Sequence, residues 1–120
     1  MGKQIEFTSS FGTEYTLAFE KASYAYGGGL AVEVHCREDG DEWWEPYGTL
    51  TKNLMGYFTP PNGAFLDANN LRDLCARVID EGWARPVGEA KSGFCVYPMV
   101  EFTDEFLDEV CYDAEKGDVL

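Results

Sequence analysis

The chain has 120 residues, with 22 Asp and Glu against 9 Lys and Arg, four Cys, one His and a formal net charge of −13. This length is typical of one domain, so we expect 1–120 to fold as a single unit, and a hydrophobic content of 45% excludes global disorder. No apolar run approaches the roughly 18 residues of a membrane span, and the first residues lack the apolar stretch of a signal peptide, so we expect a soluble cytoplasmic protein that binds no membrane.

The first half of the chain predicts antiparallel strands. Alternating apolar and polar residues predict strands over 4–8 and 14–21, which together form a hairpin. The clearest strand runs over 30–36, with its larger apolar residues on one face. An Asp-Gly pair at 39–40 favours a tight reversal, so residues 44–50 are expected to return as the antiparallel partner.

The main helix is predicted in the second half, over 70–81. Residues 52–63 are rich in Gly, Pro and Asn and form a predicted loop, which a brief strand over 64–66 follows. Apolar residues then recur at the i, i+3, i+4, i+7 and i+8 positions of one helical face. Asn70 is the predicted N-cap of this helix and Gly82 the predicted stop.

The C-terminal part predicts one strand and a second helix. After a loop over 88–93, a strand is expected over 94–102, where Pro98 indicates an edge or a bulge. Thr103 then caps a short acidic helix over 104–112. The apolar residues of the strand that share one phase are Phe94, Val96, Val100 and Phe102.

These elements indicate an α+β fold. We expect a mostly antiparallel, twisted sheet of about five strands, one main covering helix (about 70–81) and a short acidic C-terminal helix (about 104–112). The chain shows no internal repeat and no linker, so all of it is assigned to this one domain.

Three motifs within 30–102 resemble a known family. They are Gly48-Thr49-Leu50-Thr51-Lys52-Asn53-Leu54, Ala64-Phe65-Leu66-Asp67-Ala68-Asn69-Asn70, and Gly93-Phe94-Cys95-Val96-Tyr97-Pro98 ending in Glu101-Phe102. The family that they resemble is the uncharacterised domain of unknown function 4313, small proteins met on plasmids, phages and conjugative elements of gut bacteria. The resemblance implies an accessory protein of a mobile element and supplies no catalytic residues.

The negative charge is concentrated in two blocks. Residues 37–45 hold five acids and one base, and residues 101–120 hold eight acids and one base, so these 29 residues carry −11 of the −13. Residues 46–100 balance at five acids and five bases. Because duplex nucleic acid is bound through a basic surface, this charge excludes direct nucleic-acid binding and favours a basic partner protein.

The acids of the C-terminal helix are the first candidate contacts. Neighbours at i and i+4 share one side of a helix, and carboxylates spaced along that side can imitate the phosphates of a nucleic-acid backbone. Solvation alone also explains an acidic face, and this alternative stays open. The candidates here are Asp104, Glu105, Asp108 and Glu109.

The first acidic block adds two tryptophans. Adjacent strand residues face opposite sides, so we expect one of Trp43 and Trp44 to be exposed and the other to fill the core, whereas a bulge would bury both. An exposed Trp inside a charged rim has the composition of an interface hot spot. Asp39, Asp41 and Glu42 are the candidate acidic contacts beside them.

No catalytic signature emerges, so no catalytic residue is assigned and the protein is predicted not to be an enzyme. The only histidine, His35, faces away from Cys36 on a strand, so the two cannot form a nucleophile–base pair. A small hydrolase of unknown substrate remains an alternative.

No metal site and no cofactor are predicted, with zinc as the alternative. The four cysteines are separated by 38, 19 and 15 residues, without the close pair that nucleates a zinc site. Cys36, Cys75 and Cys111 fall in apolar phases and are interpreted as core residues. Cys95 and His35 are the two candidates to watch, and a zinc-containing inhibitor or regulator that uses them is the alternative function.

The sequence therefore predicts a non-enzymatic acidic interaction protein of a mobile element. It would inhibit a basic, nucleic-acid-binding host protein by occupying its binding site, as anti-CRISPR and anti-restriction mimics of nucleic acid do. The expected state is a monomer or a homodimer.

Overall fold

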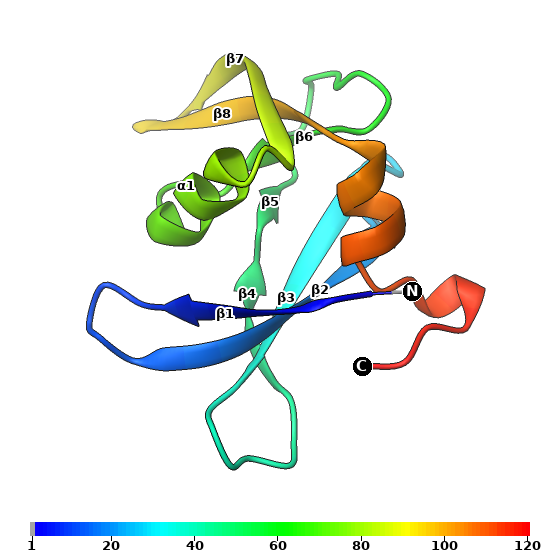
Figure 1. The fold of residues 1–120 in the computed structure, drawn as a ribbon. Helices are drawn as coiled ribbons and strands as arrows, with labels where there is room; N and C mark the ends of the chain where they lie inside the picture. The colour runs from blue at the N-terminus through cyan, green and yellow to red at the C-terminus, as the bar shows by residue number, and fades with distance from the viewer. Residues whose placement is uncertain (1) are drawn as a thin grey trace.

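The computed structural model describes residues 2–120 and has an α+β fold with two mostly antiparallel sheets (Figure 1). The strand order is β1-β2-β3-β4 in the first sheet and β5-β6-β8-β7 in the second. The strands are β1 (Gln4–Thr8), β2 (Glu14–Ser23), β3 (Leu30–Arg37), β4 (Glu45–Thr49), β5 (Thr51–Lys52), β6 (Gly63–Leu66), β7 (Ala84–Ser92) and β8 (Cys95–Phe102).

The first sheet confirms the predicted N-terminal strands. β1 has the predicted bounds, and β2 and β3 each extend slightly beyond theirs. β4 pairs antiparallel with β3 as expected, with a bulge between Val34 and His35. The reversal between them lies at the Asp-Gly pair, where Gly40 has φ +89° and the Asp41 N–H donates to the Glu38 carbonyl at 3.0 Å.

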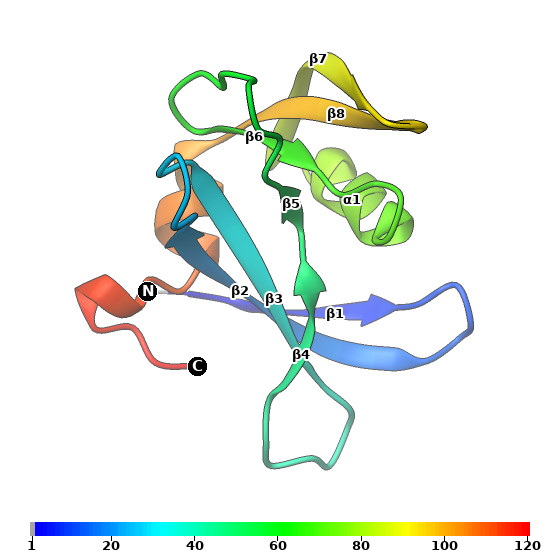
Figure 2. The ribbon, with the colours of Figure 1, turned by 180° about the vertical axis from the view of Figure 1, so that it is seen from behind.

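The prediction of one sheet of about five strands is wrong, because the chain changes sheets at Leu50. β4 belongs to the first sheet and β5, two residues on, to the second, and the two run nearly in line (Figure 2). At the crossing, the Leu50 N–H donates to the Val32 carbonyl at 2.8 Å, and the Leu50 carbonyl accepts from the Asp67 N–H at 2.9 Å. A strand that switches sheets is a standard corner between two packed sheets.

The second sheet contains a strand where a loop was predicted. β7 (Ala84–Ser92) includes residues 88–92 of the segment 88–93 expected to be a loop, and it pairs with β8 along its length. Most of β7 is exposed, and Pro86 and Gly88 lie at a bulge, so its sequence shows no alternating pattern. Pairing with β8 overrides the weak local strand preference.

The prediction that Phe94, Val96, Val100 and Phe102 share one buried face of a strand is only half right. Ser92 pairs with Cys95, so Gly93 and Phe94 form a two-residue turn, and Phe94 is fully exposed at its tip. Val96 is 40% exposed, whereas Val100 and Phe102 lie in the core as predicted. β8 is an inner strand, but β6 pairs only as far as Met99, so at Pro98 the paired neighbour is β7 alone. This local free side accommodates the missing N–H of Pro98.

The main helix is confirmed as α1 (Arg72–Asp80). Gly82 follows its end with φ +77°, as the predicted stop requires. The predicted N-cap is wrong, because Leu71 occupies that position and the Asn70 amide donates to Asp67 Oδ2 at 2.9 Å. α1 does not cover one sheet: it lies between β1 of the first sheet and β7 of the second (Figure 1).

The acidic C-terminal helix is shorter than predicted. Residues 104–105 begin it, Phe106–Val110 (η1) continue it as a π-helix, and the Phe106 N–H donates to Thr103 Oγ1 at 3.1 Å, so the predicted cap is confirmed. The helix ends at Val110, not 112, because Cys111 is extended and the Tyr112 N–H donates to the Phe19 carbonyl of β2 at 2.7 Å. A short 3₁₀ turn, η2 (Ala114–Lys116), follows.

An aromatic cluster in the core fixes this helix against both sheets. The Phe106 ring centroid lies 4.9 Å from that of Phe102, 5.3 Å from that of Phe19 and 5.6 Å from that of Trp83. Phe102 belongs to β8 and Phe19 to β2, so one side chain of the helix joins the two sheets. The opposite side of the helix must therefore face solvent.

Candidate functional site

The first acidic block forms the exposed loop between β3 and β4. Trp43 is 79% exposed, as expected for one of the two tryptophans. Trp44 is half-buried but lies outside the core, and the guanidinium of Arg37 sits 4.5 Å from its ring centroid. The expectation that one of the two tryptophans fills the core is wrong, and so is the alternative that both are buried, because both residues precede β4 in the loop and are not on a paired strand.

The acids of this loop have different roles. The Glu38 N–H donates to Asp41 Oδ2 at 3.3 Å, so Asp41 also holds the turn. Asp39 and Glu42 are exposed, and neither side chain has a hydrogen bond or an ion pair within residues 2–120. The loop thus presents two unneutralised carboxylates on either side of Asp41.

The second acidic block presents its four candidate carboxylates to solvent. Asp104, Glu105, Asp108 and Glu109 are all exposed, on the side of the helix opposite its buried apolar residues. Asp104 Oδ1 accepts from the Asn62 amide at 3.0 Å, and none of the four has an ion pair with a base in the described part of the chain.

The fold does not join the two blocks into one surface. In both views the β3–β4 loop projects at the bottom of the molecule, and the helix at 104–110 lies beside the upper sheet (Figures 1 and 2). The two blocks are therefore separate candidate surfaces.

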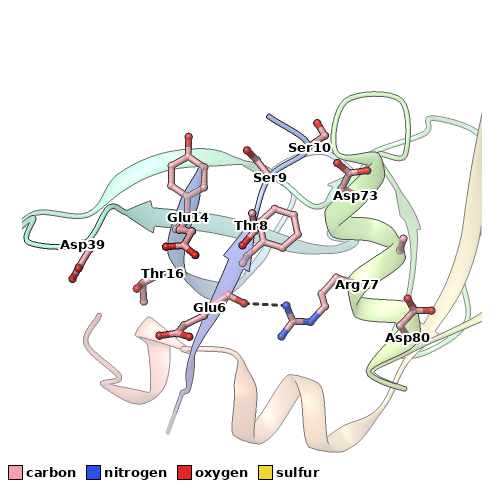
Figure 3. A pocket seen from close by; sticks show the side chains of 13 residues that line it. Glu6, Thr8, Ser9, Ser10, Glu14, Thr16, Asp39, Asp73, Arg77 and Asp80 are labelled. Carbon is pink, nitrogen blue, oxygen red and sulfur yellow. Dashed lines mark hydrogen bonds between the residues drawn. The ribbon is translucent and has the colours of Figure 1, made fainter. Parts of the chain in front are cut away.

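A third acidic surface is a groove between the β1–β2 hairpin and α1. The acidic groove has a volume of about 660 Å³, and α1 faces the two strands across it (Figure 3). Asp39 of the first block lies at one end of it (Figure 3). The carboxylates that line it are those of Glu6, Glu14, Asp39, Asp73 and Asp80.

The one base of the acidic groove is already engaged. Arg77 Nη1 donates to the Glu6 carbonyl at 2.9 Å, and its Nε donates to Glu81 Oε1 at 3.0 Å. Within residues 2–120, none of the five groove carboxylates has an ion pair. The acidic groove therefore carries a net negative charge that a cationic group can neutralise.

Four of the groove acids were missed by sequence reasoning. Glu6 and Glu14 are isolated acids of the N-terminal hairpin, and Asp73 and Asp80 belong to the segment whose charges balance. The seven-residue spacing of Asp73 and Asp80 on one helix is a signal for a shared face. Their approach to Glu6 and Glu14 depends on the packing of α1 against β1, which no local pattern contains.

The cysteines do not assemble a metal site. Cys36, Cys75 and Cys111 are buried, as predicted for core residues, and Cys95 is half-buried beside Tyr97. Burial raises the pKa of the Cys75 and Cys111 thiols from 9.0 to about 12. Over residues 2–120, the group of potential ligands that does come together contains His35 with Glu20 and Glu33, and no thiol.

A family model described as Domain of unknown function (DUF4313) matches residues 18–116, more than four-fifths of the chain. The chain belongs to this family. Searches of curated proteins and of solved structures gave no match. The DUF4313 region extends beyond 30–102 at both ends. The first acidic block lies within 30–102, and the extension to residue 116 adds most of the second.

Two of the DUF4313-like motifs meet in space. The motif at 48–54 contains the sheet crossing, and the motif at 64–70 contains β6, with Thr51 paired to Leu66. The third motif forms the tip of the β7–β8 hairpin. Within residues 2–120, no helix of this DUF4313 protein combines the length and the hydropathy of a membrane span.

Proposed function

We propose that this protein is a non-enzymatic, cytoplasmic interaction protein of a mobile element. It binds a basic host protein through exposed carboxylates and excludes nucleic acid from that protein's binding site. Anti-CRISPR and anti-restriction inhibitors are the class of protein in which we place it.

The observation that carries the proposal is the absence of ion pairs from the acidic surfaces. Between residues 2 and 120, no candidate acid of the two blocks and no groove carboxylate pairs with Lys or Arg. Packing of Phe106 and its neighbours holds Asp104, Glu105, Asp108 and Glu109 side by side despite the repulsion between like charges. Carboxylates presented in this way are available to the Lys and Arg side chains of a partner.

The exposed Trp43 supports a protein partner rather than a diffuse cation atmosphere. The Trp43 side chain is 79% exposed, so a large apolar area is in contact with water, as at a protein–protein interaction site. Tryptophan is enriched among the residues that dominate interface energies. The exposed acids Glu42 and Glu45 lie on either side of the two tryptophans in the chain and supply a charged rim.

The experiment has two stages. Immobilised protein captures partners from a host lysate, and the captured protein is then tested for basic character and for competition with duplex DNA or RNA. Competition by nucleic acid and a steep loss of affinity as salt rises are expected, because screening weakens exposed charge pairs. A partner that binds equally well at high salt, or together with its nucleic acid, would overturn the proposal.

Charge reversal locates the surface. Replacing Asp104, Glu105, Asp108 and Glu109 by Lys is expected to abolish binding and leave the fold intact, because all four side chains are exposed. Asp73→Lys with Asp80→Lys tests the acidic groove in the same way. Asp39→Lys with Glu42→Lys tests the first block, where both side chains are exposed. Glu89→Lys, the reversal of an exposed acid of β7 outside all three surfaces, is the control for charge reversal elsewhere on the protein. Retained binding by the reversal variants of all three surfaces contradicts an acidic contact surface.

A further inference from the structure

Three potential metal ligands lie together on the outer face of the first sheet. Glu20 of β2 pairs directly with Glu33 of β3, and His35 lies two residues further along β3, on the same face as Glu33. His35 Nε2 is 3.5 Å from Glu20 Oε1. One ligand atom from each of the three residues lies within 4.8 Å of those from the other two.

No Lys or Arg of residues 2–120 balances the two carboxylates of this group. Two carboxylates directly opposite each other on neighbouring strands are destabilising. Neither Glu20 nor Glu33 has an ion pair with Lys or Arg within residues 2–120. Arg37 is the nearest base along β3, but its guanidinium donates to Gln4 Oε1 and lies over Trp44. A cation between the two carboxylates would remove the repulsion.

The imidazole gives an independent indication. His35 Nε2 is buried and has no hydrogen-bond partner within the described chain, although the whole side chain is 20% exposed. Buried ring nitrogens usually have a partner, since an unsatisfied polar atom costs free energy. The acceptor nearest to it in this group is Glu20 Oε1, at 3.5 Å, which is too far for a hydrogen bond in this geometry. A ligand bound there would satisfy Nε2 and both carboxylates at once.

We propose that Glu20, Glu33 and His35 bind one divalent transition-metal ion, with zinc as the representative ion. One imidazole nitrogen and two carboxylate oxygens are zinc ligands, and imidazole disfavours magnesium and calcium, which prefer all-oxygen sites. Bonds of about 2.0–2.2 Å require the three side chains to close around the ion, while the paired strands stay in place. Three protein ligands leave one position of a tetrahedral zinc ion for water, and Glu33 is exposed to solvent.

The metal site is independent of the proposed acidic contacts. None of its three residues belongs to the two blocks or to the acidic groove. It also differs from the zinc alternative of the sequence analysis, because it uses His35 without any cysteine. Failure of either proposal therefore leaves the other standing.

The test uses the full chain without an affinity tag, freed of metal by a chelator and titrated with zinc chloride. Calorimetry is expected to give one zinc ion per chain. Since the chain contains a single histidine, its imidazole resonances report on the site without ambiguity, and zinc should shift them while magnesium at the same concentration does not. Zinc binding that leaves the His35 resonances unchanged overturns the proposal.

Variants separate this site from other zinc ligands. His35→Gln, Glu20→Gln and Glu33→Gln should each weaken zinc binding by more than the roughly 10–100-fold that loss of an outer-shell partner typically costs. Glu89→Gln is the control for exposed carboxylates, and Cys95→Ser is the control for the half-buried thiol. Both controls should bind zinc as the unmodified chain does. Zinc binding that disappears in Cys95→Ser and persists in His35→Gln contradicts the assignment.

Discussion

Burial decides the chemistry of the four thiols at the scale of single residues. Cys75 and Cys111 lie in the core, and removal from water raises their pKa from 9.0 to about 12. Burial also raises the pKa of Cys36, with a further contribution from the nearby Glu45 carboxylate. Because the thiolate is the reactive form, only Cys95 is positioned to react with thiol reagents in the folded protein.

The raised thiol pKa values predict an alkaline loss of stability. A group whose pKa is higher in the folded than in the unfolded state contributes its full stability below the unfolded value, and the contribution falls as pH rises toward the folded value. The free energy of unfolding should therefore decrease between about pH 9 and pH 12. Urea unfolding at several pH values measures it.

The control for this prediction is Cys75→Ala, in which the decrease should be smaller. Labelling of the native protein with iodoacetamide at neutral pH should modify Cys95 alone, and denaturation should expose all four thiols. Fast native labelling of Cys75 or Cys111 would contradict their burial.

Trp43 and Trp44 differ in what their removal should change. Trp43→Ala should leave stability within about 0.5 kcal/mol, because exposed substitutions rarely cost more, and should weaken binding to the captured partner by at least about 30-fold if Trp43 is a hot spot of about 2 kcal/mol. Phe11→Ala, at a side chain 94% exposed in another loop, is the matched control. Equal effects of the two variants contradict a specific role for Trp43.

At the scale of elements, the acidic helix depends on its cap and its apolar side. Its like charges destabilise it locally, and Thr103 and the Phe106 cluster hold it in place. Thr103→Ala removes the oxygen that accepts the Phe106 N–H and should cost about 1 kcal/mol. Thr103→Ser keeps that oxygen and should cost less. Urea unfolding monitored by circular dichroism compares the two, and equal losses would show that the hydroxyl does not act as a cap.

An element could be predicted from the sequence where its own residues show a clear strand or helix periodicity. β1 and α1 were predicted correctly because each has a pattern that is visible within a few neighbouring residues. This pattern is alternation of apolar and polar residues in β1 and an apolar stripe with helical spacing in α1. β7 was missed because it is mostly exposed and contains Pro86 and Gly88, so only its pairing with β8 makes it a strand. Phe94 was predicted to lie on the strand because it shares the apolar phase of Val96 and Val100. In the structure it belongs to the two-residue turn before β8.

At the scale of the whole molecule, the strand crossing at Leu50 couples the two sheets. Leu50 is fully buried and its backbone is hydrogen-bonded to both β3 and the segment after β6. Leu50→Ala should lower the free energy of unfolding by about 2–5 kcal/mol. Because the sheets share this core, we expect one cooperative transition, with circular dichroism and tryptophan fluorescence coinciding.

Leu54→Ala is a control for this prediction, since Leu54 belongs to the smaller cluster outside the main core. It should cost less than Leu50→Ala. Two separated transitions in either variant would contradict the expectation that 1–120 is a single domain.

The sequence by itself determined the charge, its concentration in two blocks, the main helix, most strands and the core character of three cysteines. These properties depend on residue type and on periodicity over a few neighbours. Only the tertiary structure decided the division into two sheets, the acidic groove and the meeting of Glu20, Glu33 and His35. Each of these depends on contacts between residues distant along the chain: the groove acids come from β1, β2, a loop and α1, and their approach follows from packing that no local pattern records.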